Sequence, residues 1–312
     1  MTSDLIKGIQ SRERISIARA ISIIESENEV SREILSAIFP FTGKAYRIGI
    51  TGPPGSGKSS LTDKIIKSFR NQNKTVAVIG VDPSSPFTGG ALLGDRIRML
   101  NHHKDAGVFI RSMASRGGQG GLAQSTREVG DVFDAAGYDV ILFETVGVGQ
   151  VELDVIQATD TVFVVLVPES GDEIQMMKAG LMEIADVFVI NKADREGANK
   201  LAITLKNLLS VLPNNPDVWK PKVVKTIAIQ NDGIDELVQA SEEHRKHIIS
   251  TGHHHRKLKQ RYIRKIKELI VSKFELEFWN DENQKILDKE IAKDRQKRLS
   301  PYQLVQKLHQ ED

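Results

Sequence analysis

Short apolar segments alternate with longer amphipathic segments through the middle of the chain, between residues 46 and 229. The segment at 162–167 is apolar at every position, which is typical of a strand covered on both faces. The apolar segments with the length of strands are 46–50, 75–82, 108–113, 139–143, 160–167, 186–190 and 222–229. This rhythm predicts an α/β fold, a doubly wound and mostly parallel sheet that binds its ligand at the carboxyl ends of the strands.

Helical periodicity continues on both sides of this region. Before it, residues 12–26 and 31–38 have apolar positions at helical spacing. After it, residues 233–251 are predicted to form the last helix that covers the sheet. A helix is also predicted at 255–278, with one apolar stripe that consists of Leu258, Tyr262, Ile266, Ile270 and Phe274.

The stripe at 258–274 needs a partner, either a second copy of the chain or another part of the same chain. Lysines and arginines occupy the opposite face of this helix, and a solvated face explains them better than a nucleic-acid site does. The chain is therefore expected to have three parts: a helical N-terminal extension at 1–43, the α/β domain at 44–250 and a C-terminal helical arm at 251–312.

A phosphate-binding loop lies between the predicted strand at 46–50 and a predicted helix at 60–69. Its residues are Gly52, Pro53, Pro54, Gly55, Ser56, Gly57, Lys58 and Ser59, with Ser60 directly behind them. The glycines allow backbone N–H groups to turn inward toward phosphate oxygens at the positive end of a helix. Lys58 is expected to lie along the outer phosphates, and the Ser59 hydroxyl to bind Mg²⁺. These residues predict a site for a nucleoside triphosphate.

The tetrapeptide Asn191-Lys192-Ala193-Asp194 directly follows the predicted strand at 186–190 and points to guanine as the base. The Asp194 carboxylate can accept hydrogen bonds from the ring N–H and the amine of guanine, and adenine offers no such pair of donors. Asn191 is expected to tie this segment to the phosphate loop, and the stem of Lys192 to lie on the base. A helix cap is the other common role of such a tetrapeptide, but its position after a strand favours GTP and GDP.

A second segment after the last predicted strand is expected to complete the base site. It contains Ile227, Ala228 and Ile229, and the Ala228 N–H is expected to donate to the keto oxygen of guanine.

Acidic residues are expected to gather around the metal. Residues 144–147, ETVG, match the DxxG element of GTP-binding proteins except that Glu144 replaces aspartate. Glu144 is expected to hold Mg²⁺ through a water molecule, and the Gly147 amide to contact the terminal phosphate. Asp82 and Asp95 are expected to approach the same ion, although each also has the position of an ordinary turn carboxylate.

Val148 stands where Ras-like enzymes have the glutamine that orients the attacking water. The isolated protein is therefore expected to hydrolyse GTP slowly and to be accelerated by a partner.

The composition excludes several classes of protein. The chain has no cysteine, which excludes disulfides and thiolate metal sites. Its 43 basic and 41 acidic residues give a net charge of +2, which favours neither nucleic acid nor an anionic membrane. No leader-like segment opens the sequence, and no apolar run approaches the roughly 18 residues that a membrane span needs. We therefore expect a cytoplasmic protein.

Five segments together resemble the methylmalonyl-CoA mutase-associated GTPases of the MeaB or ArgK type, which are related to a human protein defective in one form of methylmalonic aciduria. The segments are GPPGSGKSS, VDPSSPFTGGALLGDRIRM, ETVGVGQVE, ESGDEIQMMKAGLMEIAD and NKAD. The resemblance implies a homodimeric GTPase that gates cofactor loading of an adenosylcobalamin-dependent methylmalonyl-CoA mutase, or a related acyl-CoA mutase, and protects that enzyme. It also implies that Asp82, Asp95 and Glu144 serve the magnesium site and the switch regions, and that Lys178, in a third switch, reaches the nucleotide when the partner docks.

Two other functions stay open at this point. A nickel-delivery GTPase shares the phosphate loop and the guanine tetrapeptide, but the clusters His102-His103 and His253-His254-His255 do not make a four-ligand set. A kinase acting on an amino-acid transport protein is the other alternative, although no acceptor-binding signature is visible. Residues 111–126 contain four glycines and are expected to form a loop that is either a partner surface or a flexible linker.

Overall fold

The computed structural model describes residues 2–26, 29–83, 102, 104–115, 121–145, 147, 156, 158–168, 181–212 and 215–309. It divides into two compact units, Met1–His254 and His255–Asp312, and each is described here by itself.

The first unit contains a seven-stranded sheet in which every paired neighbour is parallel. The strands are β1 (Tyr46–Thr51), β2 (Val76–Pro83), β3 (Val108–Ser115), β4 (Val140–Glu144), β5 (Thr161–Leu166), β6 (Val187–Asn191) and β7 (Lys222–Thr226). Their order across the sheet is β3-β2-β4-β1-β5-β6-β7, so β1 lies in the middle. The seven predicted strands are thus confirmed. The last is shorter than expected, because residues 228–230 turn into the short 3-10 helix η3 (Ala228–Gln230).

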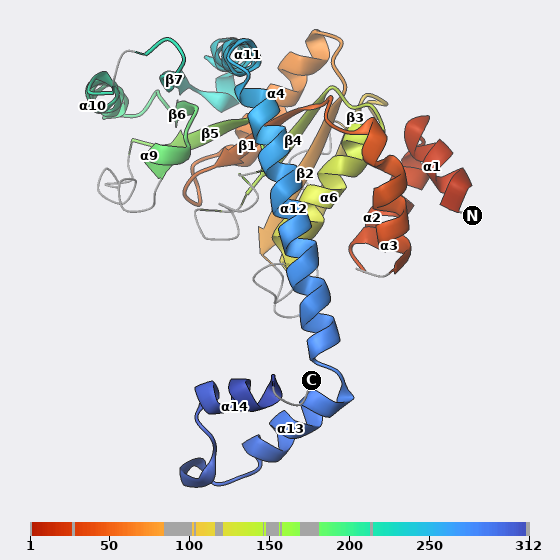
Figure 1. Ribbon diagram of the computed structural model, residues 1–312. Helices are drawn as coiled ribbons and strands as arrows, with labels where there is room; N and C mark the ends of the chain where they lie inside the picture. Colours follow the sequence, from red (N-terminus) through yellow and green to blue (C-terminus); the bar gives the residue numbers. More distant parts are fainter. Residues whose placement is uncertain are drawn as a thin grey trace. The chain divides into compact units, whose positions relative to one another are not determined.

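Helices cover both faces of this sheet (Figure 1). On one face α4 (Lys58–Asn71) and α11 (Ile234–Ser250) pack on a core of alternate residues from β1, β4, β5 and β6. On the other face α6 (Gly121–Ala135) packs on β2, β3 and β4, while α9 (Leu181–Ile184) and α10 (Ala198–Ser210) cover β5 and β6. Strands buried from both sides explain the uninterrupted apolar runs of the sequence, and the doubly wound α/β fold is confirmed.

The N-terminal helices share the core of α6. They are α1 (Thr2–Gln10), α2 (Arg14–Ile24) and α3 (Glu29–Ile38), followed by the 3-10 turn η1 (Phe39–Phe41). Apolar residues at helical spacing, such as Ile17, Ile21 and Ile24 of α2, are completely buried in one cluster with Val129 and Phe133 of α6. Within the helical extension expected at 1–43, no separate helix was expected where α1 lies, and the helix expected at 12–26 begins only at Arg14, since Arg12 has a left-handed backbone.

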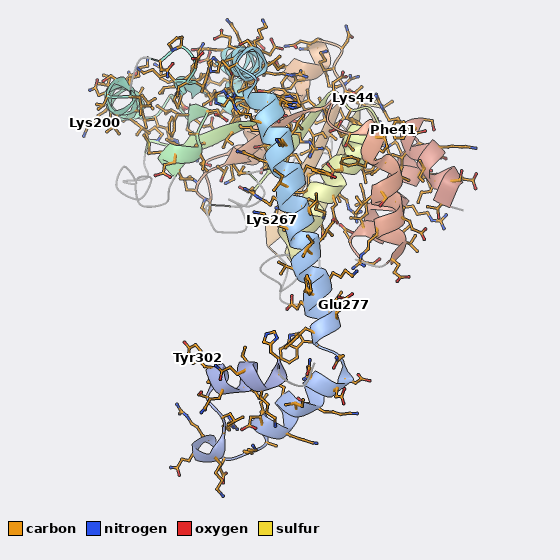
Figure 2. All side chains as sticks on the ribbon, viewed as in Figure 1. Phe41, Lys44, Lys200, Lys267, Glu277 and Tyr302 are labelled. Carbon is orange, nitrogen blue, oxygen red and sulfur yellow. The ribbon has the colours of Figure 1, made fainter. Side chains whose placement is uncertain are left out.

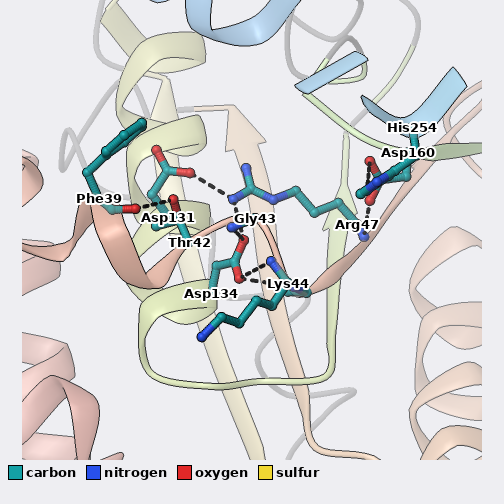
Figure 3. A network of polar contacts seen from close by, with 10 residues as sticks. Phe39, Thr42, Gly43, Lys44, Arg47, Asp131, Asp134, Asp160 and His254 are labelled. Atoms are coloured by element: carbon teal, nitrogen blue, oxygen red, sulfur yellow. Dashed lines mark hydrogen bonds and ion pairs between the residues drawn. The ribbon is translucent and has the colours of Figure 1, made fainter. Parts of the chain in front are cut away.

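A buried polar network holds the start of β1 against α6 (Figure 3). Asp134 accepts hydrogen bonds from the backbone N–H groups of residues 43–45 at 2.8 to 3.0 Å, and Arg47 donates to Asp134 at 2.9 Å and to Asp131 at 2.7 Å. The Arg47 backbone N–H also donates to Asp160, whose other oxygen lies 3.7 Å from His254 Nε2. Burial alone would lower the pKa of Arg47, but the carboxylates of Asp131 and Asp134 outweigh it and raise that pKa above its ordinary value. A buried charge therefore has its partners at the amino ends of the strands, opposite the edge where a ligand is expected.

The loop expected at 111–126 is wrong at both ends. Strand β3 continues to Ser115 through its pairing with β2, and α6 begins at Gly121. Residues 116–120 lie outside the described part of the chain. The glycine-rich composition suggested a long loop, but burial of the β3 and α6 side chains in the core overrides that local preference.

The second unit is helical. It contains most of α12 (His253–Phe278), then α13 (Asp281–Ile291), the 3-10 turn η4 (Arg295–Lys297) and α14 (Pro301–Leu308). The Asn280 side chain caps α13, and Ser300 forms a capping box with Gln303 at the start of α14. The Phe278 ring contacts those of Trp279 and His309, which closes the helices of this unit on one another.

Helix α12 has no buried residue, and charged side chains such as those of Lys267 and Glu277 project from it (Figure 2). Four of the five residues of the predicted apolar stripe are exposed, with Phe274 66% and Tyr262 54% accessible, and Leu258 is partly buried. No helix in the described ranges has both the length and the apolar composition to cross a bilayer.

Candidate functional site

The phosphate loop follows β1, whose every residue is buried, and it ends where α4 begins. Gly57 caps α4 with a left-handed backbone, φ +86°, so the first N–H groups of the helix face the inside of the loop. Gly52 has φ +144°, and a Cβ there would lie 2.1 Å from the Val165 carbonyl oxygen of β5. The loop can therefore follow this path only with glycine at both positions.

Two side chains inside the loop fit a phosphate ligand. Lys58 is buried and folds back over the loop, where its Nζ donates to Gly52 O at 2.8 Å and to Pro53 O at 3.0 Å. The Ser56 hydroxyl is completely buried and has no hydrogen-bond partner within the described part of the chain. A buried hydroxyl without a partner is costly, and a bound phosphate oxygen would satisfy it. Ser60 lies in the first turn of α4, next to these residues.

Asn191 joins three loops at the carboxyl edge of the sheet. Its Nδ2 donates to Ser56 O at 2.8 Å, and its Oδ1 accepts from Thr226 Oγ1 at 3.2 Å and from Ala228 N at 3.3 Å. The side chain is 2% exposed. The tie expected between Asn191 and the phosphate loop is therefore present as a hydrogen bond, and the same amide also holds the segment after β7.

The other residues of the expected base site surround Asn191. Lys192 has a left-handed backbone, φ +56°, and its Nζ donates to Gly55 O at 2.9 Å, so its stem crosses from β6 to the phosphate loop. Asp194 is exposed, and its carboxylate has no hydrogen-bond partner among the described residues. Ile227 exchanges two backbone hydrogen bonds with Asp232, which holds the segment in place, and Ile229 is exposed. These residues lie along one rim, with the Asp194 carboxylate available to a ligand.

The first turn of α4 and the end of β4 bring together oxygen atoms suited to a magnesium ion. Ser59 Oγ donates to Glu144 Oε1 at 2.6 Å, and both residues are buried. An alcohol and a carboxylate in contact match the hard oxygen ligands that Mg²⁺ prefers. Gly147 is buried near the loop, since a Cβ on it would lie 3.9 Å from Cγ and Cδ of Pro54.

Three expected site residues cannot be placed. Asp82 belongs to the end of β2, but its side chain lies outside the described part of the structure, as do Asp95 and Lys178 entirely. Two residues that the sequence reasoning missed lie beside Gly147, namely Thr51 and Thr145. Their positions in the sequence could have drawn attention to them, because Thr51 directly precedes the phosphate loop and Thr145 lies within ETVG. No short-range pattern, however, predicts that the two side chains contact each other.

Described histidines of the two clusters contact neighbouring polar side chains of this chain. His102 Nε2 lies 2.8 Å from Asp63 Oδ1 of α4. Burial alone would raise the pKa of Asp63, but the hydrogen bond from His102 and the charge of Lys67 hold that pKa below its ordinary value. His253 Nδ1 contacts Thr251 Oγ1 at 2.9 Å. Within the described ranges, no group of three or more histidine, aspartate and glutamate side chains is placed to hold a metal ion.

Comparisons with known proteins show the family to which the chain is similar. The family model of methylmalonyl Co-A mutase-associated GTPase MeaB matches residues 17–283. A protein of Pyrococcus abyssi that is named as a GTPase is 47% identical over 308 residues, 97% of this chain and 94% of that protein. GTPase ArgK of Escherichia coli is 37% identical over 80% of this chain and 78% of its own length. The methylmalonic aciduria type A homolog of Mus musculus, named as mitochondrial, is 34% identical over 80% of this chain and 64% of its own length.

A solved structure described as LAO/AO transport system kinase superimposes with a TM-score of 0.74 at 28% identity. The match covers 99% of this chain and 97% of the other.

We expect Gly57→Ala to destabilise the first unit more than Gly55→Ala. Both glycines have a left-handed backbone, φ +86° and +78°, but a Cβ at Gly57 would lie 2.5 Å from Asn191 Nδ2, whereas one at Gly55 would meet nothing within 4 Å. The left-handed backbone costs an alanine about 1–2 kcal/mol in each variant. Losing the bond from Asn191 adds about 1–3 kcal/mol at Gly57 only. Urea unfolding of both variants measures the difference, and equal losses would mean that Asn191 does not hold the loop.

Proposed function

Since this chain belongs to the family of methylmalonyl Co-A mutase-associated GTPases MeaB, we propose that it binds GTP at the carboxyl edge of the sheet and hydrolyses it to control a partner enzyme. The observation that carries the proposal is the position of Asn191, which bonds the phosphate loop and the segment after β7 at the same time. One nucleotide can then contact both loops, with its phosphates over α4 and its base beside β6 and β7.

Binding exchanges hydrogen bonds that the site already makes. Lys58 would leave the carbonyls of Gly52 and Pro53 and donate to the outer phosphates, and Ser56 would gain a phosphate oxygen as its acceptor. Ser59 and Glu144 would hold a magnesium ion, which supplies positive charge against the phosphates when bound. Asp82 and Asp95 are proposed as further carboxylates of that metal site, and Lys178 as a residue that reaches the nucleotide once a partner has docked.

Guanine selectivity is assigned to Asp194 and to the N–H of Ala228. The Ala228 N–H donates to Asn191 Oδ1 at the long distance of 3.3 Å, so a keto oxygen could compete for it. The exposed Asp194 carboxylate would accept from the two N–H groups of guanine.

We expect Asp194→Asn to lower GTP affinity by about a hundredfold or more and to raise affinity for xanthosine triphosphate. An asparagine amide can donate to the second keto oxygen of xanthine, whereas it repels the amine of guanine. Glu196→Gln is the matched control, because it removes an equally exposed carboxylate two residues away. Isothermal titration calorimetry measures these affinities, and titration of the wild type with both GTP and ATP tests whether the site prefers guanine. Equal heats for GTP and ATP would contradict guanine binding altogether.

The partner is proposed to be an adenosylcobalamin-dependent methylmalonyl-CoA mutase or a related acyl-CoA mutase, whose cofactor loading this protein gates and which it protects. The support is the family match together with the mouse relative that is named for methylmalonic aciduria. A partner could also supply a group that orients the attacking water, since Val148 stands in the sequence where Ras-like enzymes have glutamine.

Single-turnover hydrolysis of GTP labelled at the terminal phosphate tests this partner. We expect slow release of phosphate from the isolated protein, no release with EDTA, and an acceleration of at least about tenfold when the cobalamin-loaded mutase is added, because groups supplied in trans can accelerate such reactions by far more. An unchanged rate together with no co-sedimentation of the two proteins would refute the partner. Transfer of the label to a protein would favour phosphorylation, the second candidate, to which the name of the similar solved structure points.

We also propose that the exposed stripe of α12 forms a homodimer. Tyr262, Ile266, Ile270 and Phe274 are each at least 39% exposed, and a second copy would bury them.

Substituting Ile266 and Ile270 with glutamate in the full chain is expected to convert a dimer to a monomer in sedimentation analysis, because charges oppose burial of the stripe. Val211→Glu, at a position of the first unit that is 84% exposed, is the control and should leave the mass unchanged. A dimer that persists after both stripe substitutions would contradict the role of α12.

A further inference from the structure

Two buried threonine hydroxyls meet at the junction of β1, β4 and the phosphate loop. Thr51 is the last residue of β1, Thr145 directly follows β4, and each is 1% exposed. Strands β1 and β4 are paired in register up to Ile50 and Glu144, and the Thr145 N–H donates to Ile50 O at 3.0 Å. The ladder therefore places the two threonines side by side, one step beyond its last paired residues.

Both hydroxyls converge on one carbonyl group. Thr51 Oγ1 donates to Gly147 O at 2.9 Å, and Thr145 Oγ1 lies 3.2 Å from both Gly147 O and Thr51 Oγ1. Each hydroxyl has one proton, so Thr51 gives its proton to Gly147 O, while Thr145 donates to Gly147 O, to Thr51 Oγ1 or, at 3.4 Å, to Ile50 O. Because the groups are shielded from water, removing either hydroxyl leaves a buried polar atom with poorer pairing.

The carbonyl that they hold belongs to the residue expected to sense the terminal phosphate. Gly147 lies beside the phosphate loop, since a Cβ at this position would be 3.9 Å from Cγ and Cδ of Pro54. Glu144, three residues earlier, contacts Ser59 of α4. The threonine pair thus connects the two loops that would meet the terminal phosphate and the metal.

We propose that Thr51 and Thr145 are positioning residues that hold Gly147 in place for the terminal phosphate and so set the preference of the site for GTP over GDP. This inference rests on the proposed GTP site. With Gly147 already fixed, the terminal phosphate finds its N–H donor without ordering the segment first, which strengthens GTP binding. GDP lacks the third phosphate of GTP, which Gly147 is expected to contact, so the affinity of GDP does not depend on Gly147.

The test compares the affinities of a non-hydrolysable GTP analogue and of GDP by calorimetry. Thr51→Val keeps the shape of the side chain and removes the hydroxyl. It is expected to weaken binding of the analogue about tenfold, the effect of roughly one lost hydrogen bond, while GDP affinity changes less than about twofold. Thr51→Ser keeps the hydroxyl and should restore the preference for the analogue. Thr145→Val is also expected to weaken binding of the analogue without changing GDP affinity, but by a smaller factor. This variant provides the test if Thr51→Val fails to fold.

Thr159→Val is the control for the loss of a buried hydroxyl as such. Thr159 is 2% exposed and donates to Ile156 O at 2.6 Å, away from the expected nucleotide, so its loss should affect stability without changing either affinity. If Thr51→Val weakens the analogue and GDP equally, or neither, the threonines are structural and the inference is wrong. If the wild type binds neither nucleotide, the proposed function itself is wrong, which is a different result from an unchanged ratio.

Discussion

The amide of Asn191 is the interaction on which the geometry of the site depends. This one side chain donates to the loop after β1 and accepts from Thr226 and Ala228, at and after the end of β7. Strand β7 lies three strands away from β1 in the sheet. Loops at a sheet edge otherwise move independently, since few buried contacts cross between them. Because Asn191 bonds to both, the phosphate loop and the segment 227–229 that is expected to contact the base are held in a fixed position relative to each other. Gly57 has to be glycine because the amide occupies the space that a Cβ would need.

The buried polar groups at the two ends of the strands differ in how completely they are satisfied by the protein. At the amino ends, Asp134 accepts three backbone N–H groups as well as Arg47, so both of its oxygens have partners within the fold. At the carboxyl ends, Lys58 bonds carbonyls of its own loop, Ser59 bonds Glu144, and the Ser56 hydroxyl has no partner among the described residues. Groups of the first kind stabilise the fold, whereas those of the second kind can exchange their bonds for a ligand at small net cost.

Much of this could be predicted from the sequence, because short-range patterns determine it. Each strand of the sheet was indicated by an apolar run, and the phosphate loop and the tetrapeptide at 191–194 fall at strand ends, as their chemistry requires. The expectation failed at 111–126, where glycines suggested a loop although pairing with β2 extends β3 to Ser115. Within the helical extension expected at 1–43, α1 was not predicted as a separate helix, because its buried residues Leu5 and Ile9 are too few to show a helical period. In each case tertiary packing decided the structure.

The contacts between Thr51, Thr145 and Gly147 show why part of a site escapes sequence reasoning. A threonine is common at the end of a buried strand, and neither residue belongs to a phosphate-binding pattern. Their meeting follows from the register of β1 and β4, which brings residues 94 positions apart within 3.2 Å of each other. Sequence patterns identify groups that touch a ligand, because ligand chemistry restricts their type and spacing. Groups that position those residues are restricted only by the fold, so they become visible once the strand register is known.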